Sequence, residues 1–422
     1  MVPIIDRELL PDRLGKVRKH SSWVPILAAV LVAVLMLGAV AGFMVQIGNN
    51  RERHQSETPA RVPAGILYTM HNPISIIGNK GFKHINGVSA GTGTASDPYI
   101  IADWDINAST ADGILINDTD AYFIVRNCYI HDGGSFHAGI DLRHGINGTL
   151  ENNTCSNNIV GIYLNSSSNN MLINNSCSNS LGGIGLDYSH NNTLVNNTCS
   201  LNTIDDIGLS SSSNNTLSEN NCSSSNDDGI YLYFSSNNTL SNNTCSSNDY
   251  AGIALDSSSN AKLVNNTCDW NVFGIHLNFW SNNNEISQNS VRNNAGYGVS
   301  IYGWSSLNRI WNNTFINNNG AGSTYDSNHV QAIDDGTNNN WNISGSPHGY
   351  GNFWSDWTTP DANHNGIVDQ PYAMDGSAGA QDYYPLTTVQ TQIPEFGMMP
   401  LTLVALMAVI VIAEETRRKE KS

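Results

Sequence analysis

Apolar residues return at a fixed interval through the middle of the chain, and runs of Asn, Ser and Thr separate them. One column of leucine and isoleucine has a period of 22 to 24 residues and consists of Leu150, Leu172, Leu194, Leu217, Leu240, Leu263, Ile286 and Ile310. A Gly-Ile pair and a cysteine recur with the same step. A period of this size indicates a solenoid, in which each repeat buries its apolar face against its neighbours.

The short-range pattern distinguishes strands from helices. The segments "GIYL", "GIGL", "GIAL" and "GIHL" alternate apolar and variable residues, which is the period of a strand with one buried face. Two or three short strands per repeat predict one coil of a parallel β-helix, with successive coils about 4.8 Å apart. Equivalent residues then stand above one another, so corner asparagines can hydrogen-bond to their equivalents one coil away.

The seven cysteines are predicted to occupy an inward apolar position. Six of them follow the leucine column by five residues, and later repeats place Val291 and Phe315 there. Free cysteine behaves as a small buried hydrophobe, and stacked side chains that point the same way are poorly placed for disulfides. Packing is therefore the favoured interpretation, and the alternatives are one or more disulfides or a thiolate metal ladder.

Apolar and basic segments near both ends predict a membrane topology. Residues 23–45 carry no charge and are long enough to span a bilayer, and a basic tail at 1–22 precedes them. A second apolar run, 396–413, precedes a basic tail at 414–422. We therefore expect a cell-membrane protein with both termini in the cytoplasm and the large domain outside. The alternatives are a cleaved signal peptide at Ala39-Val40-Ala41 and a C-terminal sorting signal.

Between these ends we expect a linker at 46–64, the β-helix at 65–340, a capping module at 341–388 and a second linker at 389–395. The chain has 19 Lys and Arg residues against 36 Asp and Glu, with a formal net charge of −17. An acidic exterior repels phosphate backbones, so nucleic-acid binding is excluded. It suits cations, neutral glycans or a basic partner.

The repeated phrases resemble a known family. G-I-x-L with N-N-T-L-x-N-N-T-C is similar to the NosD-type right-handed parallel β-helix, also described as the carbohydrate-binding and sugar-hydrolase repeat. "GTGTASDPYIIADWDI" (91–106), "GNFWSDWTTPDANHNGIVDQPY" (351–372) and "DYYPL" (382–386) resemble the opening and terminal segments of archaeal members. "IPEFG" resembles an archaeal Pro-Glu-Phe sorting signal, which implies processing by an archaeosortase.

The fold class that we expect is therefore all-β: a right-handed single-stranded parallel β-helix of about ten coils of 22–24 residues. An N-terminal and a C-terminal transmembrane helix would flank it.

Carboxylates in two successive coils are the candidates for catalysis. Asp205-Asp206 and Asp227-Asp228 stand at nearly equivalent positions, where paired carboxylates could act as acid and base in glycoside hydrolysis. The repeats lack the Gly-His-Gly and Arg-x-Lys motifs of polygalacturonase-type β-helices. The favoured interpretation is that these acids are solvated at the corners of the coils, or that calcium screens the charges of the stacked carboxylates.

Aromatic residues beside Asn and Asp are the candidates for sugar binding. Two positions after each Gly-Ile pair turn outward, and aromatic residues lie at or just beyond them. We expect carbohydrate binding by Tyr231, Tyr233, Phe234, His276, Phe279, Trp280, Tyr302 and Trp304. The alternative is aromatic stacking along the sheet with a structural role.

One segment predicts a metal site. In "DANHNGIVD" the residues Asp361, Asn363 and Asn365, followed by Gly366 and by Asp369, match the first part of an EF-hand-like calcium loop. An Asx-rich turn without metal is the alternative. Copper is not expected, because His137 and His144 flank an extended strand and lie roughly 20 Å apart.

These features favour a membrane-anchored surface protein that binds a glycan or cell-envelope component without cleaving it. A polysaccharide hydrolase or lyase, and a purely structural surface spacer, are the alternatives.

Overall fold

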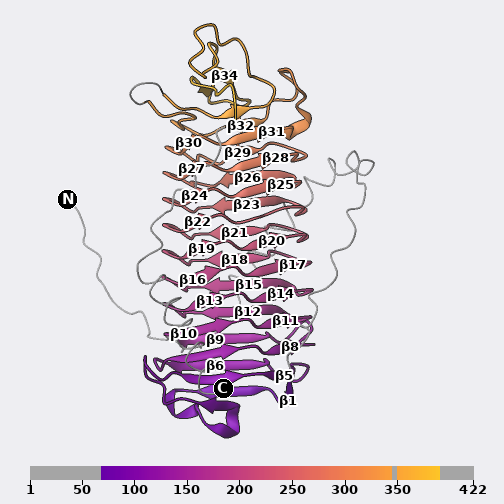
Figure 1. Cartoon of the computed structure of the whole chain (residues 1–422), viewed down its shortest axis with the longest axis vertical. Helices are drawn as coiled ribbons and strands as arrows, with labels where there is room; N and C mark the ends of the chain where they lie inside the picture. The colour runs from indigo at the N-terminus through magenta and orange to yellow at the C-terminus, as the bar shows by residue number, and fades with distance from the viewer. Residues whose placement is uncertain (1–67, 345–348, 390–422) are drawn as a thin grey trace, which may run out of the picture. The chain divides into compact units, whose positions relative to one another are not determined.

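The computed structural model describes residues 68–344 and 349–389. They form a right-handed parallel β-solenoid in which each coil crosses three sheets, here called sheets I, II and III, before it returns one level higher (Figure 1). The strands within each sheet pair in parallel, except that β3 and β4 are antiparallel. The expected solenoid is confirmed.

Sheet I has eleven strands in the order β2 (Ile74–Ile77), β6 (Ile114–Thr119), β9 (Ile140–Gly145), β12 (Val160–Asn165), β15 (Gly182–Asp187), β18 (Ile207–Ser210), β21 (Ile230–Tyr233), β23 (Ala251–Asp256), β26 (Phe273–Asn278), β29 (Val299–Ile301) and β32 (Ala332–Asp334). Sheet II also has eleven, in the order β3 (Val88–Ala90), β4 (Tyr99–Ala102), β7 (Phe123–Arg126), β10 (Gly148–Glu151), β13 (Met171–Ile173), β16 (Thr193–Val195), β19 (Thr216–Ser218), β22 (Thr239–Ser241), β24 (Lys262–Val264), β27 (Glu285–Ser287) and β30 (Arg309–Trp311).

Sheet III comes in two parts that single bridges through Thr244 connect. The first part contains β1 (Thr69–His71), β5 (Trp104–Asn107), β8 (Tyr129–His131), β11 (Thr154–Ser156), β14 (Ser176–Ser178), β17 (Thr198–Ser200) and β20 (Asn221–Ser223). The second contains β25 (Thr267–Asp269), β28 (Ser290–Arg292), β31 (Thr314–Ile316) and β33 (Phe353–Trp354). A hairpin of β34 (Tyr372–Ala373) and β35 (Gln381–Asp382) follows.

The coils have the predicted length only in the middle of the solenoid. Paired residues of sheet I are 22 to 24 residues apart at every step from Ile140 to Val299. The coil from Ile74 to Ile114 is longer because it holds β3 and the short helices η1 (Asn79–Gly81) and η2 (His84–Asn86). The coil from Val299 to Ala332 is longer because it holds η3 (Asn318–Gly320). The sequence period therefore misses the elements that close the two ends.

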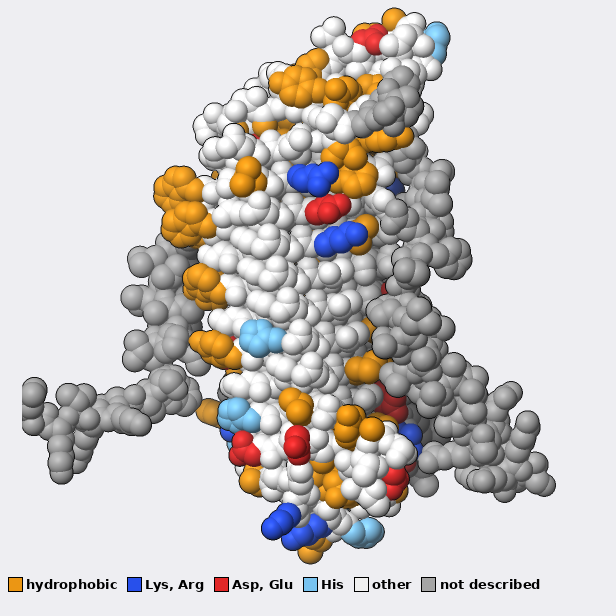
Figure 2. All heavy atoms as spheres, turned by 90° about the vertical axis from the view of Figure 1, so that its left-hand side faces the viewer, with side chains coloured by type: hydrophobic (Ala, Val, Ile, Leu, Met, Phe, Trp, Pro, Cys, Tyr) orange, Lys and Arg blue, Asp and Glu red, His pale blue; other side chains and the backbone are white. Residues whose placement is uncertain are grey.

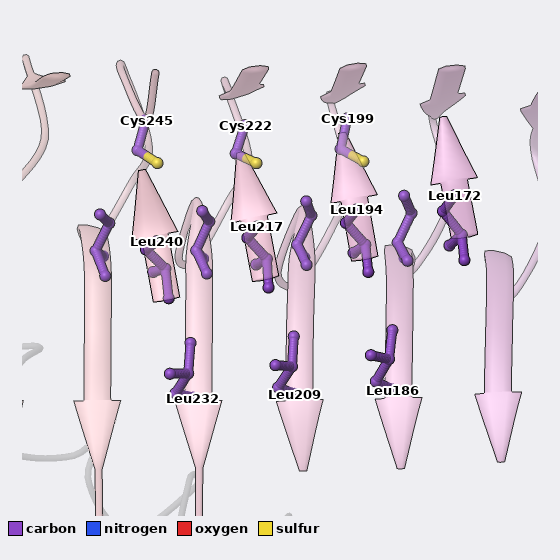
Figure 3. Close-up of a cluster of buried hydrophobic side chains, with 14 of the residues drawn as sticks. Leu172, Leu186, Leu194, Cys199, Leu209, Leu217, Cys222, Leu232, Leu240 and Cys245 are labelled. Atoms are coloured by element: carbon purple, nitrogen blue, oxygen red, sulfur yellow. The ribbon is translucent and has the colours of Figure 1, made fainter. Parts of the chain in front are cut away.

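Columns of identical apolar side chains form the core. Leucine pairs with leucine along sheet II, and Gly-Ile isoleucines pair along sheet I, as the period predicted. In Figure 3 the sulfur atoms of Cys199, Cys222 and Cys245 lie in a line beside the leucines of sheets I and II. All seven cysteines are free and buried, so the packing interpretation is confirmed. Cys128 lies outside the column, because Ile130 pairs with Cys155 and leaves Cys128 two residues earlier at a corner.

Buried asparagines connect the coils at the corner between sheets II and III. In each coil the backbone N–H and the Nδ2 of one asparagine both donate to the Oδ1 of the asparagine one coil further on, as Asn175 does to Asn197 at 3.0 Å. The same Nδ2 donates to the leucine carbonyl of the preceding coil, Leu150 in this case, at 2.8 Å. We call this set the asparagine ladder, and it comprises Asn153, Asn175, Asn197, Asn220, Asn243, Asn266, Asn289, Asn313 and Asn352. The predicted cross-coil bonds are therefore present.

The C-terminal segment closes the last coil with aromatic rings. Trp354 stacks on Phe315 with ring centroids 4.3 Å apart and on Tyr372 at 4.1 Å. Buried Asp382 accepts hydrogen bonds from the backbone N–H of Asn352 and from Nε1 of Trp354. The last member of the asparagine ladder is thus supplied and anchored by the cap.

Among residues 68–344 and 349–389, no helix is long and apolar enough to cross a bilayer. The predicted spans at 23–45 and 396–413 lie outside the described residues.

We predict that Asn243→Ala lowers the free energy of unfolding by about 3 kcal/mol, because the amide and backbone groups of Asn220 and the carbonyl of Leu217 lose buried partners. The midpoint of urea unfolding measures this loss. The control is Asn242→Gly, because Asn242 is exposed with φ 57° and glycine adopts that conformation freely. Equal losses in both variants would contradict a special role for the ladder.

We also predict that the native protein resists thiol alkylation, because burial raises the pKa of Cys222 to about 12 and encloses the other thiols. After denaturation without reductant, intact mass should show seven modified thiols. A smaller number would reveal a disulfide.

Candidate functional site

Two outward columns follow the buried isoleucines of sheet I. The first runs through Asp141, Tyr163, Gly185, Gly208, Tyr231, Ala254, His276 and Ser300, and neighbouring members pair directly. The second runs through Arg143, Asn165, Asp187, Ser210, Tyr233, Asp256 and Asn278. Sequence spacing predicted both columns in register.

The residue after each sheet I strand turns the chain toward sheet II in the left-handed backbone conformation. Ser166, Ser211 and Ser257 take this position with φ between 49° and 52°. Other coils place aromatic residues at this corner, also with positive φ, and we call them the aromatic row: Tyr188, Phe234, Phe279, Trp280 and Trp304. A bulky residue in this conformation costs roughly 1–2 kcal/mol, so the backbone gives no reason for these side chains.

The aromatic row faces solvent. The exposed fraction is 59% for Tyr188, 54% for Phe234, 57% for Trp280 and 68% for Trp304, whereas Phe279 is half-buried. Trp280 and Trp304 stack on each other with ring centroids 5.6 Å apart, and Phe234 meets Tyr233 edge-on at 4.4 Å. Figure 2 looks onto sheet II, and hydrophobic side chains form a line along the left edge of that largely uncharged face.

Other expected sugar contacts are less accessible. His276 is buried under Tyr250, Phe273 and Tyr302, and its Nδ1 lies 2.7 Å from the Ser300 hydroxyl. Burial lowers the pKa of His276 to about 4. Its outward position was predicted correctly, but its accessibility was not, because Phe273 of the same strand and rings from the neighbouring coils cover it. Tyr231 and Tyr302 are half-buried.

Tyr250 and Phe273, which cover His276, escaped the prediction. Each belongs to the residues just before a Gly-Ile pair, where the chain enters sheet I. The signal was present in the sequence as "YAGI" and "FGI", four and three positions before the first outward column.

Three of the four predicted acids come together where the chain enters sheet I. Carboxylate oxygens of Asp205, Asp227 and Asp228 lie within 4.8 Å of one another. Asp206 points elsewhere, because the Nδ2 of Asn202 donates to its Oδ1 at 2.7 Å in the buried corner. We call the first three the carboxylate cluster. Asp228 is buried and accepts a hydrogen bond from the backbone N–H of Ala251, while Asp205 and Asp227 are partly exposed.

Burial and mutual repulsion keep protons on the carboxylate cluster. Desolvation, followed by the charge of Asp227, raises the pKa of Asp205 to about 8. Desolvation also raises the pKa of Asp228, and the charges of Asp205 and Asp227 add to the effect. The cluster therefore resembles a shared proton site more than a fully ionised surface patch.

Comparison with models of known protein families gives a match to the repeated part of the chain. The family model described as "Periplasmic copper-binding protein (NosD)" matches residues 94–266 and 205–359, together more than half of the chain. The chain belongs to the NosD family. A search of curated proteins finds no match.

Solved structures with a similar fold include enzymes that act on acidic polysaccharides. The periplasmic alginate epimerase AlgG has a TM-score of 0.46 and 18% identity, over 58% of this chain and 67% of the other. A mannuronan C-5 epimerase A-module from Azotobacter vinelandii has 0.44 and 16%, over 57% and 78%. A pectate lyase has 0.36 and 14%, over 64% and 80%. These likenesses concern the fold alone.

The described residues of this NosD-family chain do not fit the copper of the family description. Copper is bound by converging imidazole, thiolate or thioether ligands. Here His131 contacts Asp105 and Asp132, His137 faces Asp112, and His144 faces Asp118. The thiols are enclosed in the core. Within the described ranges, the one group of three or more converging His, Cys, Asp or Glu ligands is the carboxylate cluster, which offers only oxygen.

The predicted calcium loop folds as a chain of Asx turns. Oδ1 of Asp361 and Oδ1 of Asn363 both accept the backbone N–H of Asn365, and Oδ2 of Asp361 accepts that of Gly366. Asp369 accepts the backbone N–H of Ala362 at 2.8 Å. The loop therefore brings the predicted ligands together at one turn, and calcium binding stays a prediction.

The carboxylate cluster predicts how stability depends on pH. Because the pKa of Asp205 is raised in the folded state, its folded form favours the proton, and stability falls as pH rises from the unfolded pKa of about 4 through about 8. Asp205→Asn removes this penalty. The melting temperature of the variant should therefore exceed that of wild type by more at about pH 9 than at about pH 5.

Both proteins are measured with a chelator, since a divalent cation could replace the proton. Asp103→Asn is the control, because Asp103 is exposed with φ 64°, a conformation that asparagine tolerates. A difference in melting temperature between Asp205→Asn and wild type that stays constant with pH would contradict the raised pKa of Asp205.

Proposed function

We propose that this chain is an exported, membrane-tethered member of the NosD family that binds a neutral polysaccharide or cell-envelope glycan along the aromatic row without cleaving it. The tether is the pair of terminal apolar segments, and an archaeosortase processes the second of them by recognising "IPEFG". The observation that carries the proposal is the exposure of four aromatic rings at corners whose backbone disfavours them.

The spacing of the row suits an extended sugar chain. Tyr188 and Phe234 are two coils apart, and so are Phe234 and Phe279, which corresponds to about 10 Å along the solenoid. A polysaccharide that runs parallel to the solenoid axis can therefore stack about every second sugar ring on an aromatic side chain of the row. Serine corners at Ser211 and Ser257 lie between these aromatic side chains and offer hydroxyl groups.

The charge of the chain favours a neutral ligand. The net charge is −17, and the coils around the row offer few basic groups to an acidic sugar. Aromatic faces stack on the C–H faces of sugars, and the Asn and Ser side chains beside them bond to hydroxyls. The negative charge of this chain would repel an acidic polysaccharide.

The carboxylate cluster favours one alternative, a polysaccharide-cleaving enzyme. Asp205 would act as the acid, because its pKa of about 8 keeps it protonated at neutral pH, and Asp227 would be the second carboxyl group of the pair. Incubation of the protein with polysaccharides distinguishes the two functions, since an enzyme would produce shorter chains and a binding protein would not.

The variant Phe234→Ser/Trp280→Ser should weaken polysaccharide binding by about tenfold or more, because each ring of a binding hot spot contributes about 1–2 kcal/mol. Serine already occupies the Phe234 position in the coils on either side, so the backbone should be undisturbed. Affinity is measured with the full chain in detergent, by retardation in polysaccharide gels after a glycan array has selected the ligand.

Trp270→Ser is the matched control, because Trp270 is 56% exposed and has φ 62° but lies at a corner after sheet III. Equal weakening by the control would contradict the role of the row. A wild-type protein that binds no glycan would favour the structural spacer.

A further inference from the structure

A second column of exposed side chains lies at the corner between sheets II and III. Asn152, Asn174, Asn196 and Asn242 occupy it with φ between 53° and 57°, and all four are exposed. We call them the acceptor column. Each begins an Asn-x-Ser/Thr sequence, for example Asn196-Asn197-Thr198. This is the acceptor sequence for N-linked glycans.

The structure separates the two asparagines of each repeat. The second, such as Asn197, is buried in the asparagine ladder and uses its amide there. The first turns outward, and the Nδ2 of Asn196 donates to the Oδ1 of Asn174 at 2.8 Å on the surface. The acceptor amide is therefore the accessible one. The sequence shows the acceptor sequences and makes a few glycans at exposed corners plausible, but it does not show which of the two corner asparagines is accessible.

The same position in other coils does not qualify. Glu219 and Gln288 occupy it in two coils, and Asn265 and Asn312 in two more. The side-chain oxygens of Asn265 and Asn312 are buried without a hydrogen bond from a described residue. The four residues of the acceptor column are thus the exposed members of this corner that keep the acceptor sequence.

We propose that the acceptor column carries N-linked glycans. Asn191, Asn214 and Asn237 are also exposed and begin Asn-x-Thr sequences, and they lie at the other edge of sheet II, on the side of the aromatic row. The donor is an oligosaccharide on a lipid diphosphate. The asparagine Nδ2 bonds to the anomeric carbon, the bond from that carbon to the diphosphate oxygen breaks, the lipid diphosphate leaves, and one amide proton is released. The step needs no oxidant or reductant. This inference rests on the exported location in the proposed function.

The coil spacing limits how many sites are occupied at once. Asn152, Asn174 and Asn196 belong to successive coils, about 4.8 Å apart, which is too close for a glycan on each. The coil of Glu219 lies between Asn196 and Asn242, so Asn242 has twice this separation. One molecule should therefore carry fewer than four glycans on the column, with Asn242 the most fully occupied.

The test is glycopeptide mass spectrometry on the full chain purified from its source cells. We expect glycan on Asn242 and on at least one of the other three. Thr244→Val should abolish the glycan on Asn242, because it removes the acceptor sequence but keeps the asparagine and a side chain of similar shape. Asn242→Gln should lose the same mass. The control is Asn243→Gln, which changes the residue next to Asn242 but keeps the acceptor sequence. The molecules of this variant that reach the cell surface should keep the glycan on Asn242.

Labelling of intact cells with an impermeant amine reagent makes the outcomes separable. Four unmodified asparagines on surface-labelled protein would overturn the inference and leave the proposed glycan binding intact. Glycan on Asn242 in a protein that fails to bind polysaccharide would support the inference while the proposed function fails.

Discussion

The cross-coil hydrogen bond of the buried corner asparagine is the interaction on which this solenoid depends. A chain that turns three times per coil leaves backbone N–H and C=O groups unpaired at each corner, and burial makes every such group costly. The asparagine amide matches this need because it offers two donors and an acceptor on one short side chain. In the ladder its Oδ1 receives two bonds from one neighbouring coil while its Nδ2 supplies bonds to both. The coils therefore lock together by polar contacts as well as by the leucine columns.

This arrangement leaves the outer surface free to vary. Because the ladder and the apolar columns define each coil, the outward residues of sheet I and the left-handed corner positions are free to vary. Some of them still bond across coils, as His276 does to Ser300. Serine, tyrosine and phenylalanine replace one another at the same corner position without a change of backbone conformation. Trp280 stands in a corner that is one residue longer. Function can therefore be read from the positions where a residue departs from what the backbone would favour, and the aromatic row is the clearest set of such departures.

The sequence predicted the regular part of the molecule because stacking makes equivalence in the period identical to contact in space. Leu150 above Leu172, and Tyr163 beside Gly185, follow directly from the 22-residue step. The period could not predict the long end coils, nor the burial of His276, because cover by Tyr250 and Phe273 depends on ring conformations that the alternation of strand residues does not encode. It also placed Asp206 with its neighbour Asp205, whereas Asp206 accepts a hydrogen bond from Asn202 in the buried corner. The adjacent Asp227 and Asp228 of the next coil, in contrast, both join the cluster.

The two readings of the aromatic row differ in what they require of solvent exposure. A structural role would place the rings against one another or against the sheet, as happens for Phe315, Trp354 and Tyr372 in the cap, where each ring is fully enclosed. In the row Trp280 and Trp304 stack and Phe234 meets Tyr233 edge-on, yet these three row members still keep more than half of their surface exposed. Rings that gain little burial cannot offset a strained backbone of roughly 1–2 kcal/mol each. A ligand that covers them supplies the missing burial, and this comparison favours recognition over architecture.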